Sequence, residues 1–259
     1  MISDIKTLFW FLMQGPKFYS TLWMQIFAKL MPSKDSSQHA KTATRWCQDN
    51  LTTADGCFQD IGISVSDNPM EEVFSHEYEL QINNIIQNSK SNFGGGGYSN
   101  LIYTICEKLG VINAIETGVA YGWSSAAILK SISNRNGQLI SIDMPMLHQE
   151  DYHLIGVAVE PALHDYWELN RVPDRYGLPR AILSMEGSLD LVHYDSDKSY
   201  YGRKWSQEII WKSLKIGGIF ISDDIEDNTA FMEFATQNNL RYSIIEFERK
   251  YVGIIKKLN

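Results

Sequence analysis

Residues 111–125 constrain the fold of this chain more than any other segment. They read Val-Ile-Asn-Ala-Ile-Glu-Thr-Gly-Val-Ala-Tyr-Gly-Trp-Ser-Ser, an apolar run that ends in a carboxylate and is followed by two glycines and then by serines. The pattern predicts a strand, a tight turn and a helix, because Gly118 and Gly122 let the backbone turn and approach a ligand without a Cβ in the way. Such a turn is typical of a nucleotide-binding site.

The spacing of these glycines differs from the dinucleotide fingerprint G-x-G-x-x-G. Counted from Gly118, the second glycine of the fingerprint would fall at position 120, which is Ala120. The next glycine is Gly122, and no third glycine stands where the fingerprint requires one. A pyrophosphate site is therefore disfavoured. A glycine turn between a strand and a helix can also serve packing alone.

A second buried strand is predicted at residues 138–143, after the Asn136-Gly137 turn, and it ends in Asp143. One carboxylate can accept hydrogen bonds from both hydroxyls of a vicinal diol, so Asp143 is the predicted ribose ligand. The third strand must follow in residues 144–182, but the irregular, proline-interrupted pattern there does not place it.

Acidic residues follow two further predicted strands. Residues 189–194 run into Asp195, and residues 217–222 run into Asp223 and Asp224. Because parallel strands end at the same edge of a sheet, we expect these acids to meet beside the glycine turn. Clustered carboxylates repel one another unless a cation joins them, and hard oxygen ligands favour Mg²⁺.

The cluster also offers a candidate base. Lys198 lies three residues after Asp195 and could take a hydroxyl proton if desolvation and a nearby cation lowered its pKa. Acids and a lysine at strand ends can also simply pair with one another. His193, inside the strand, is interpreted as a packed strand residue.

The two motifs resemble those of class I S-adenosylmethionine-dependent methyltransferases, in particular metal-dependent O-methyltransferases of the catechol and caffeoyl-CoA type. The first motif, Glu-x-Gly-x-x-x-Gly-aromatic-Ser, is similar to the cofactor turn of that family. The resemblance implies that the cofactor S-adenosyl-L-methionine binds at four positions, with the serine holding its carboxylate: Glu116, Gly118, Gly122 and Ser124.

The second motif resembles the family's metal ligand followed by its catalytic lysine. This implies that Asp195, Asp223 and Asp224 hold the metal and that Asp195 and Lys198 are catalytic. The family's next strand ends in Asp-Asn, whereas this chain has Asp223-Asp224, which also resembles macrocin-type sugar O-methyltransferases. The extra negative charge leaves the identity of the metal open.

The C-terminal pattern supports the same fold class. Residues 240–247 and 250–256 predict two strands joined by a short turn, and the family resembled ends in such a hairpin. We expect an α/β domain over residues 98–259 with a Rossmann-like, mostly parallel seven-stranded sheet and a C-terminal antiparallel hairpin. Residues 1–97 are expected to form a helical N-terminal extension.

Charge and cysteine content restrict the partners and the compartment. A net charge of −8 argues against nucleic acid, and the odd set of three cysteines suggests neither a disulfide framework nor a zinc site. The apolar run at residues 8–13 is too short to span a bilayer and precedes no cleavage site. We expect a cytoplasmic protein without a transmembrane segment.

Two segments leave alternatives open. Residues 18–31 predict a helix with an apolar stripe that packs on the main domain or on a second copy in a homodimer, or lies on a membrane surface; packing is favoured, since its polar side carries few basic residues. Residues 94–97 are four glycines that could form part of a lid or a flexible linker.

The predicted reaction is transfer of a methyl group from S-adenosyl-L-methionine to a hydroxyl of a small molecule, such as a sugar or a natural product, with Mg²⁺. The first alternative is a metal-independent N- or O-methyltransferase that uses a general base. Others are a catalytically silent cofactor-binding or scaffold protein and a nicotinamide-dependent enzyme.

Overall fold

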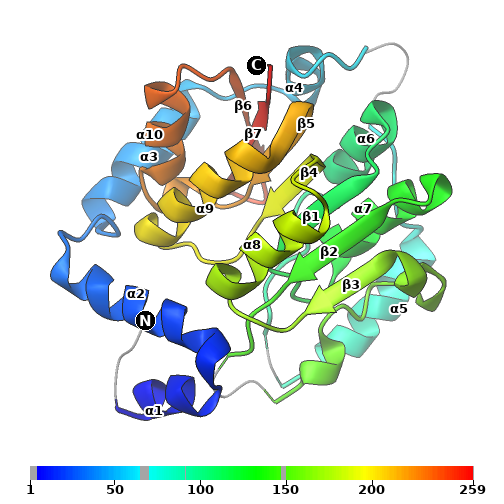
Figure 1. Ribbon diagram of the computed structural model, residues 1–259. Coiled ribbons are helices and arrows are strands. Elements are labelled where there is room, and N and C mark those ends of the chain that lie inside the picture. Colours follow the sequence, from blue (N-terminus) through cyan, green and yellow to red (C-terminus); the bar gives the residue numbers. More distant parts are fainter. Residues whose placement is uncertain (1–4, 65–69, 91, 147–149, 259) are drawn as a thin grey trace.

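A seven-stranded sheet forms the centre of the molecule, with strand order β3-β2-β1-β4-β5-β7-β6 (Figure 1). The computed structural model describes residues 5–64, 70–90, 92–146 and 150–258. The strands are β1 (Asn113–Thr117), β2 (Gln138–Ile142), β3 (Trp167–Asn170), β4 (Leu189–Tyr194), β5 (Leu214–Ser222), β6 (Tyr242–Phe247) and β7 (Lys250–Lys256). Strands β1 to β5 are parallel, and β7 is antiparallel to β5 and β6. The predicted sheet and C-terminal hairpin are confirmed.

Helices cover both faces of this sheet, which explains why most residues of its inner strands β1 and β4 are buried. The helices along the α/β domain are α6 (Ser99–Leu109), α7 (Trp123–Ile132), α8 (Asp174–Ser184), α9 (Tyr200–Ser213) and α10 (Ala230–Gln237). One core cluster includes side chains of α6 and α7, and a second includes side chains of α8, α9 and α10. All six residues of β4 are buried.

The strand that the sequence did not place is β3. It has four residues at the edge of the sheet, none of them fully buried, so it carries no apolar signal. Short 3₁₀ helices occupy the connections: η1 (Pro16–Phe18), η2 (Ser133–Arg135), η3 (Tyr152–Leu154), η4 (Pro161–Tyr166) and η5 (Ile225–Asp227).

The N-terminal part is helical, as predicted, and some of its side chains belong to the two hydrophobic clusters that pack on the sheet. Its helices are α1 (Ile5–Met13), α2 (Tyr19–Leu30), α3 (Ser37–Asp49), α4 (Ala54–Asp60) and α5 (His76–Gln87). Cys47 of α3 lies in one core cluster and Phe58 of α4 in the other. The Thr52 N–H donates to the Ile244 carbonyl at 2.8 Å. Helices α3 and α4 thus pack against the C-terminal hairpin, and a domain boundary at residue 97 stays a prediction.

Helices α1 and α2 lie apart from the sheet, at the lower left of Figure 1. They form a small cluster of their own around Phe11, Phe18 and Leu22. No helix among the described residues is long and apolar enough to cross a membrane. The cysteines are buried free thiols.

Candidate active site

A cavity of 1040 Å³ lies where the carboxyl ends of β1, β2, β4 and β5 meet. The turn after β1 contributes Gly118 to its wall, and β2 is followed by Asp143 in the same wall. Asp195 follows β4, and Asp223 follows β5. The position matches the rule that open α/β sheets bind ligands beyond the carboxyl ends of their strands.

The two glycines of the predicted turn have different structural roles. Gly118 has φ +80°, and a Cβ there would overlap the backbone carbonyl of Asp195, so the position requires glycine. Gly118 lies on the cavity wall. Gly122, with φ +86°, would place a Cβ 2.7 Å from the Cα of Gly156. Its close approach is therefore to another loop, and it does not line the cavity.

Glu116 lies beneath this turn and not on its surface. Its side chain is fully buried and accepts hydrogen bonds from the hydroxyls of Ser124 at 2.6 Å, Ser141 at 2.9 Å and Ser125. Glu116 and Ser124 thus bind each other and tie β1 to β2 and to the start of α7. Neither lines the cavity, so a direct contact of either with a cofactor stays a prediction.

Asp143 faces the cavity from the end of β2. Its Oδ1 accepts the Val119 N–H at 3.0 Å, and its Oδ2 pairs with the guanidinium of Arg171. Burial raises the pKa of Asp143, and Arg171 opposes that rise. The carboxylate is therefore fixed beside the turn, where a diol could reach it.

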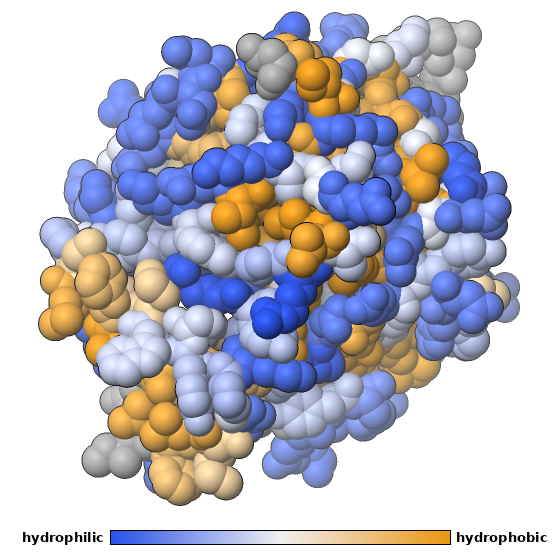
Figure 2. Space-filling view, viewed as in Figure 1, coloured by the Kyte–Doolittle hydropathy of each residue, from blue (hydrophilic) through white to orange (hydrophobic). Residues whose placement is uncertain are grey.

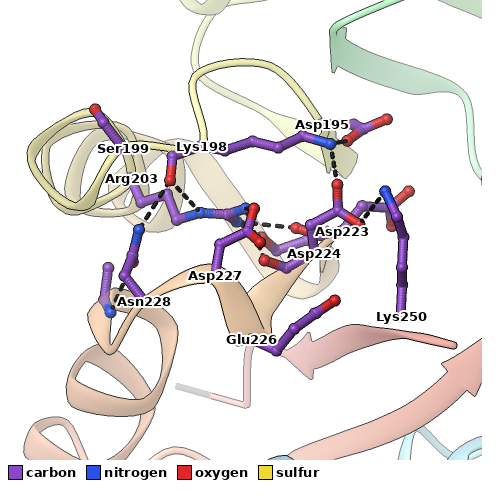
Figure 3. A network of polar contacts seen from close by, with 12 residues as sticks. Asp195, Lys198, Ser199, Arg203, Asp223, Asp224, Glu226, Asp227, Asn228 and Lys250 are labelled. Carbon is purple, nitrogen blue, oxygen red and sulfur yellow. Dashed lines mark hydrogen bonds and ion pairs between the residues drawn. The ribbon is translucent and has the colours of Figure 1, made fainter. Parts of the chain in front are cut away.

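The predicted acidic residues do come together, and two lysines join them (Figure 3). Lys198 Nζ lies 3.0 Å from Asp195 Oδ1 and also pairs with Asp224 Oδ2. Lys250 Nζ, which comes from β7, lies 2.9 Å from Asp224 Oδ1. Burial alone would lower the pKa of Lys198, but the carboxylates of Asp195 and Asp224 outweigh it and raise that pKa.

Arg203 of α9 is a buried residue that the sequence interpretation did not identify. Its guanidinium donates to Ser222 Oγ at 3.1 Å and to the carbonyl oxygens of Asp223 and Asp224, each at 2.9 Å. It therefore holds the turn in which Asp224 adopts φ +53°. An arginine in a polar helix reads as a surface residue, so the sequence carries no signal for this role.

His193 is the second residue that was missed, since it does more than pack in its strand. Its Nδ1 lies 3.3 Å from Glu116 Oε1, and its Nε2 lies 3.4 Å from Asp223 Oδ2. Burial would lower the pKa of His193, but Asp223 and Glu116 raise it well above the usual value. His193 thus connects Glu116, which lies beneath the Gly118 turn, with Asp223 of the acidic cluster.

The donor set does not fit the predicted magnesium ion as it is arranged. Within residues 5–64, 70–90, 92–146 and 150–258, no group of three or more His, Cys, Asp or Glu side chains could hold a metal. Both oxygens of Asp224 face ammonium groups. Of the three predicted metal ligands, this leaves only the carboxylates of Asp195 and Asp223. The ammonium groups of lysines thus neutralise carboxylates that a metal cation was expected to neutralise.

The comparisons with known proteins match this geometry. Residues 115–225 match a family model described as a methyltransferase domain. This segment, which includes the Gly118 turn and the acidic cluster, is therefore similar to a methyltransferase domain. The sheet order of the chain, with an antiparallel last hairpin, places its turn and acidic cluster at one edge. No curated protein matches the chain in sequence.

Solved structures share the fold of this chain at low sequence identity. An O-methyltransferase from Bacillus cereus in complex with SAH is 16% identical, with a TM-score of 0.52 over 84% of this chain and 100% of that one. The SAH-bound methyltransferase PaMTH1 of Podospora anserina is 11% identical, with a TM-score of 0.54 over 88% and 98%. The O-methyltransferase TomG from Streptomyces achromogenes is 10% identical, with a TM-score of 0.52 over 73% and 92%.

Proposed function

We propose that this chain transfers the methyl group of S-adenosylmethionine to a hydroxyl of a small molecule. The observation that supports this most is that one cavity joins the Gly118 turn and Asp143 with the ion pair of Asp195 and Lys198. A methyl donor and a hydroxyl acceptor could therefore meet inside it. The SAH- and SAM-bound structures with the same fold support the choice of cofactor.

The cofactor would lie along the turn after β1. Gly118, Val119 and Ala120 offer backbone there without bulky side chains at the closest point, and Asp143 follows within the same wall. The ribose hydroxyls would donate to Asp143, whose position is already fixed by Val119 and Arg171. Glu116 would act below the turn by keeping its shape.

The acceptor hydroxyl would bind next to Asp195 and Lys198. Its oxygen attacks the sulfonium methyl, the new C–O bond forms as the C–S bond breaks, and the cofactor leaves as a neutral thioether. Asp195 takes the hydroxyl proton, and the Lys198 ammonium stabilises the negative charge that develops on oxygen. Because the ion pairs keep Lys198 protonated, its predicted role as base would require those pairs to open first.

A metal-independent reaction fits the cluster better than the magnesium-assisted one expected from the sequence. Lys198 and Lys250 already neutralise Asp224, and alignment of donor and acceptor together with proton removal can supply the catalysis. The acceptor hydroxyl is then oriented by side chains of the chain itself.

The experiment is a methyl-transfer assay with methyl-labelled S-adenosylmethionine, run on sugars, phenols and amines in the presence of EDTA and again with added Mg²⁺. We expect label on an oxygen of the product, at the same rate under both conditions. Activity that EDTA abolishes and Mg²⁺ restores would contradict the metal-independent mechanism. Label found only on nitrogen, or cofactor binding without transfer to any acceptor, would contradict the proposed reaction.

A further inference from the structure

Helix α2 spans the cavity from the end of β2 to the start of α9. Near its start, Leu22 belongs to the small cluster against which Met144 packs, and Met144 directly follows Asp143. Just after its last turn, the carbonyl of Pro32 accepts a hydrogen bond from the Tyr201 hydroxyl at 3.1 Å. Four side chains of the helix line the cavity between these two points: Thr21, Met24, Gln25 and Ala28. The helix thus forms a wall shared by the two regions where cofactor and acceptor are proposed to bind.

The polarity of α2 is inverted relative to that of an ordinary surface helix. Its exposed side is apolar (Figure 2), and Trp23 on that side is 68% exposed. Its cavity side carries Thr21 and Gln25, which lie four residues apart and are therefore neighbours on the helix surface. A surface helix normally turns its apolar side toward the protein and its polar side toward solvent. Such a conflict between local sequence and burial is expected at a functional site.

The two polar side chains have buried oxygen atoms without hydrogen-bond partners. Thr21 Oγ1 and Gln25 Oε1 are shielded from solvent, and neither is hydrogen-bonded to any of the residues that the structure describes. By contrast, Thr44 and Thr104 in other helices donate to the carbonyl oxygen four residues earlier, at 2.9 Å and 2.7 Å. Buried polar atoms are nearly always hydrogen-bonded in proteins. An unpaired set of two on a cavity wall therefore indicates a site for the polar group of a ligand.

The charges of the cavity wall restrict the class of ligand. Among the described residues of the wall, acidic side chains outnumber basic ones. Lys198 and Lys250 already pair with Asp224, and neither Thr21 nor Gln25 carries a charge. An acceptor with a phosphate or carboxylate group would thus be repelled, whereas an uncharged acceptor would not.

We propose that Thr21 and Gln25 bind a second hydroxyl of an uncharged acceptor that is otherwise mainly apolar. This inference rests on the proposed function, in which the hydroxyl to be methylated lies beside Asp195. The second hydroxyl donates to Gln25 Oε1 and accepts the Thr21 hydroxyl, so both buried oxygens gain a partner. The apolar part of the acceptor lies against Met24 and Ala28. The pair thus selects acceptors with a hydroxyl at each end.

Acceptor binding to the chain saturated with S-adenosylhomocysteine tests this inference without the need for turnover. The probes are straight-chain diols of eight, ten and twelve carbons with one hydroxyl at each end, and the matching alcohols with a single hydroxyl. Isothermal titration calorimetry should show that the wild type binds at least one diol about tenfold more tightly than the alcohol of the same length. The reason is that the alcohol leaves the buried oxygens of the pair without a partner.

The double variant Thr21→Val/Gln25→Met nearly keeps the size of both side chains and removes their hydrogen-bonding groups. It should lose the preference for the diol. Its affinity for S-adenosylhomocysteine should equal that of the wild type, since Asp143 and the Gly118 turn are unchanged. Its resistance to urea should not fall, because two unpaired buried polar atoms are replaced by apolar groups.

The matched control is Gln38→Met/Thr42→Val, which makes the same pair of changes four residues apart on an exposed part of α3. It should keep the preference for the diol.

Three results would overturn the inference. The first is a wild type that binds S-adenosylhomocysteine but binds no diol more tightly than its alcohol, and the second is a preference that Thr21→Val/Gln25→Met retains. The third is a loss of S-adenosylhomocysteine affinity in that variant, which would place the pair in the cofactor site. Failure of the wild type to bind S-adenosylhomocysteine would instead contradict the proposed function, and this inference with it.

Discussion

The turn after β1 and the acidic edge after β4 and β5 lie in the same cavity but are built differently. Beneath the turn, the carboxylate of Glu116 is saturated by three serine hydroxyls and by His193. At the acidic edge, Asp223 Oδ1 is buried without a hydrogen-bond partner, and burial raises the pKa of Asp195 to about 6. The carboxylate beneath the turn is satisfied by the protein alone, whereas the acidic edge keeps one carboxylate oxygen without a hydrogen-bond partner.

This difference separates residues that stabilise the fold from residues that we expect to act in the reaction. A buried charge with all its partners stabilises the fold and holds a fixed shape, and the removal of one partner is costly. A buried carboxylate oxygen without a hydrogen-bond partner lowers stability, and such atoms gather where a ligand or a reaction uses them. We therefore expect substitutions under the turn to change stability and substitutions at the edge to change activity.

The largest effect is expected for Asp195→Asn. Loss of the group that accepts the hydroxyl proton should lower kcat by about 100- to 1000-fold. The free energy of unfolding should stay the same or rise at pH 7, because a carboxylate whose burial opposes ionisation has been removed. Steady-state kinetics and urea unfolding measure the two effects.

The control for this variant is Asp197→Asn, which changes a carboxylate of the same loop that accepts the Ser199 N–H. It should retain most of the activity. Equal losses of activity in both variants would mean that the loop responds to any change of charge, and Asp195 would have no special role.

Glu116→Gln should show the opposite pattern. The amide places two N–H groups among serine donors and leaves His193 without one of its two carboxylates, so we expect a loss of about 3–5 kcal/mol in the free energy of unfolding. Chemical denaturation measures it. A variant with unchanged stability but a raised KM for the cofactor would show that Glu116 contacts the cofactor directly.

Asp174 gives a pH dependence of stability with a definite sign. Burial raises the pKa of this cavity-lining carboxyl to about 7, and the Ser196 hydroxyl, which donates to it, opposes the rise. Between about pH 4 and 7 the folded chain keeps a proton that the unfolded chain releases, so this contribution to stability falls as the pH rises through that window.

Asp174→Asn should remove that contribution. Relative to the wild type, the variant should gain about 2–4 kcal/mol in the free energy of unfolding when the pH is raised from 4.5 to 8. Urea unfolding at the two pH values measures the difference. An identical pH dependence in both chains would show that Asp174 is ionised throughout.

The smallest change in the free energy of unfolding is expected for Lys250→Met. The Lys250 side chain is 60% exposed, and exposed ion pairs contribute below about 1 kcal/mol. Lys215→Met is the matched control, because Lys215 pairs with the buried Asp190 at the other end of the sheet. A stimulation by Mg²⁺ that appears only in Lys250→Met would show that Lys250 stands in for a cation at Asp224.

The sequence predicted the fold well because the relevant signals are local. The apolar runs at β1, β2, β4 and β5 are each followed by a residue that lines the cavity, and the last two strands are joined by a short turn. The strand β3 was not placed because an exposed edge strand needs no apolar pattern.

The site was predicted less completely because its contacts are not local. Asp143, Asp195, Asp223, Asp224 and Lys198 lie together as expected, because parallel strands end at one edge. Three features depend on strand register and side-chain direction. Glu116 points inward, His193 joins it to Asp223, and Lys250 reaches Asp224 from β7. These follow only from the assembled sheet.

Binding of S-adenosylhomocysteine, measured by isothermal titration calorimetry, tests the central claim most directly. The wild type should bind one equivalent, and Asp143→Asn should bind at least about tenfold more weakly, since a diol loses its charged acceptor. Asp190→Asn changes a carboxylate that also accepts backbone N–H groups and pairs with a basic residue, but at the opposite end of the sheet, and it should bind as the wild type does. A wild-type chain that gives no binding heat at any temperature, or equal affinities in all three proteins, would contradict the account.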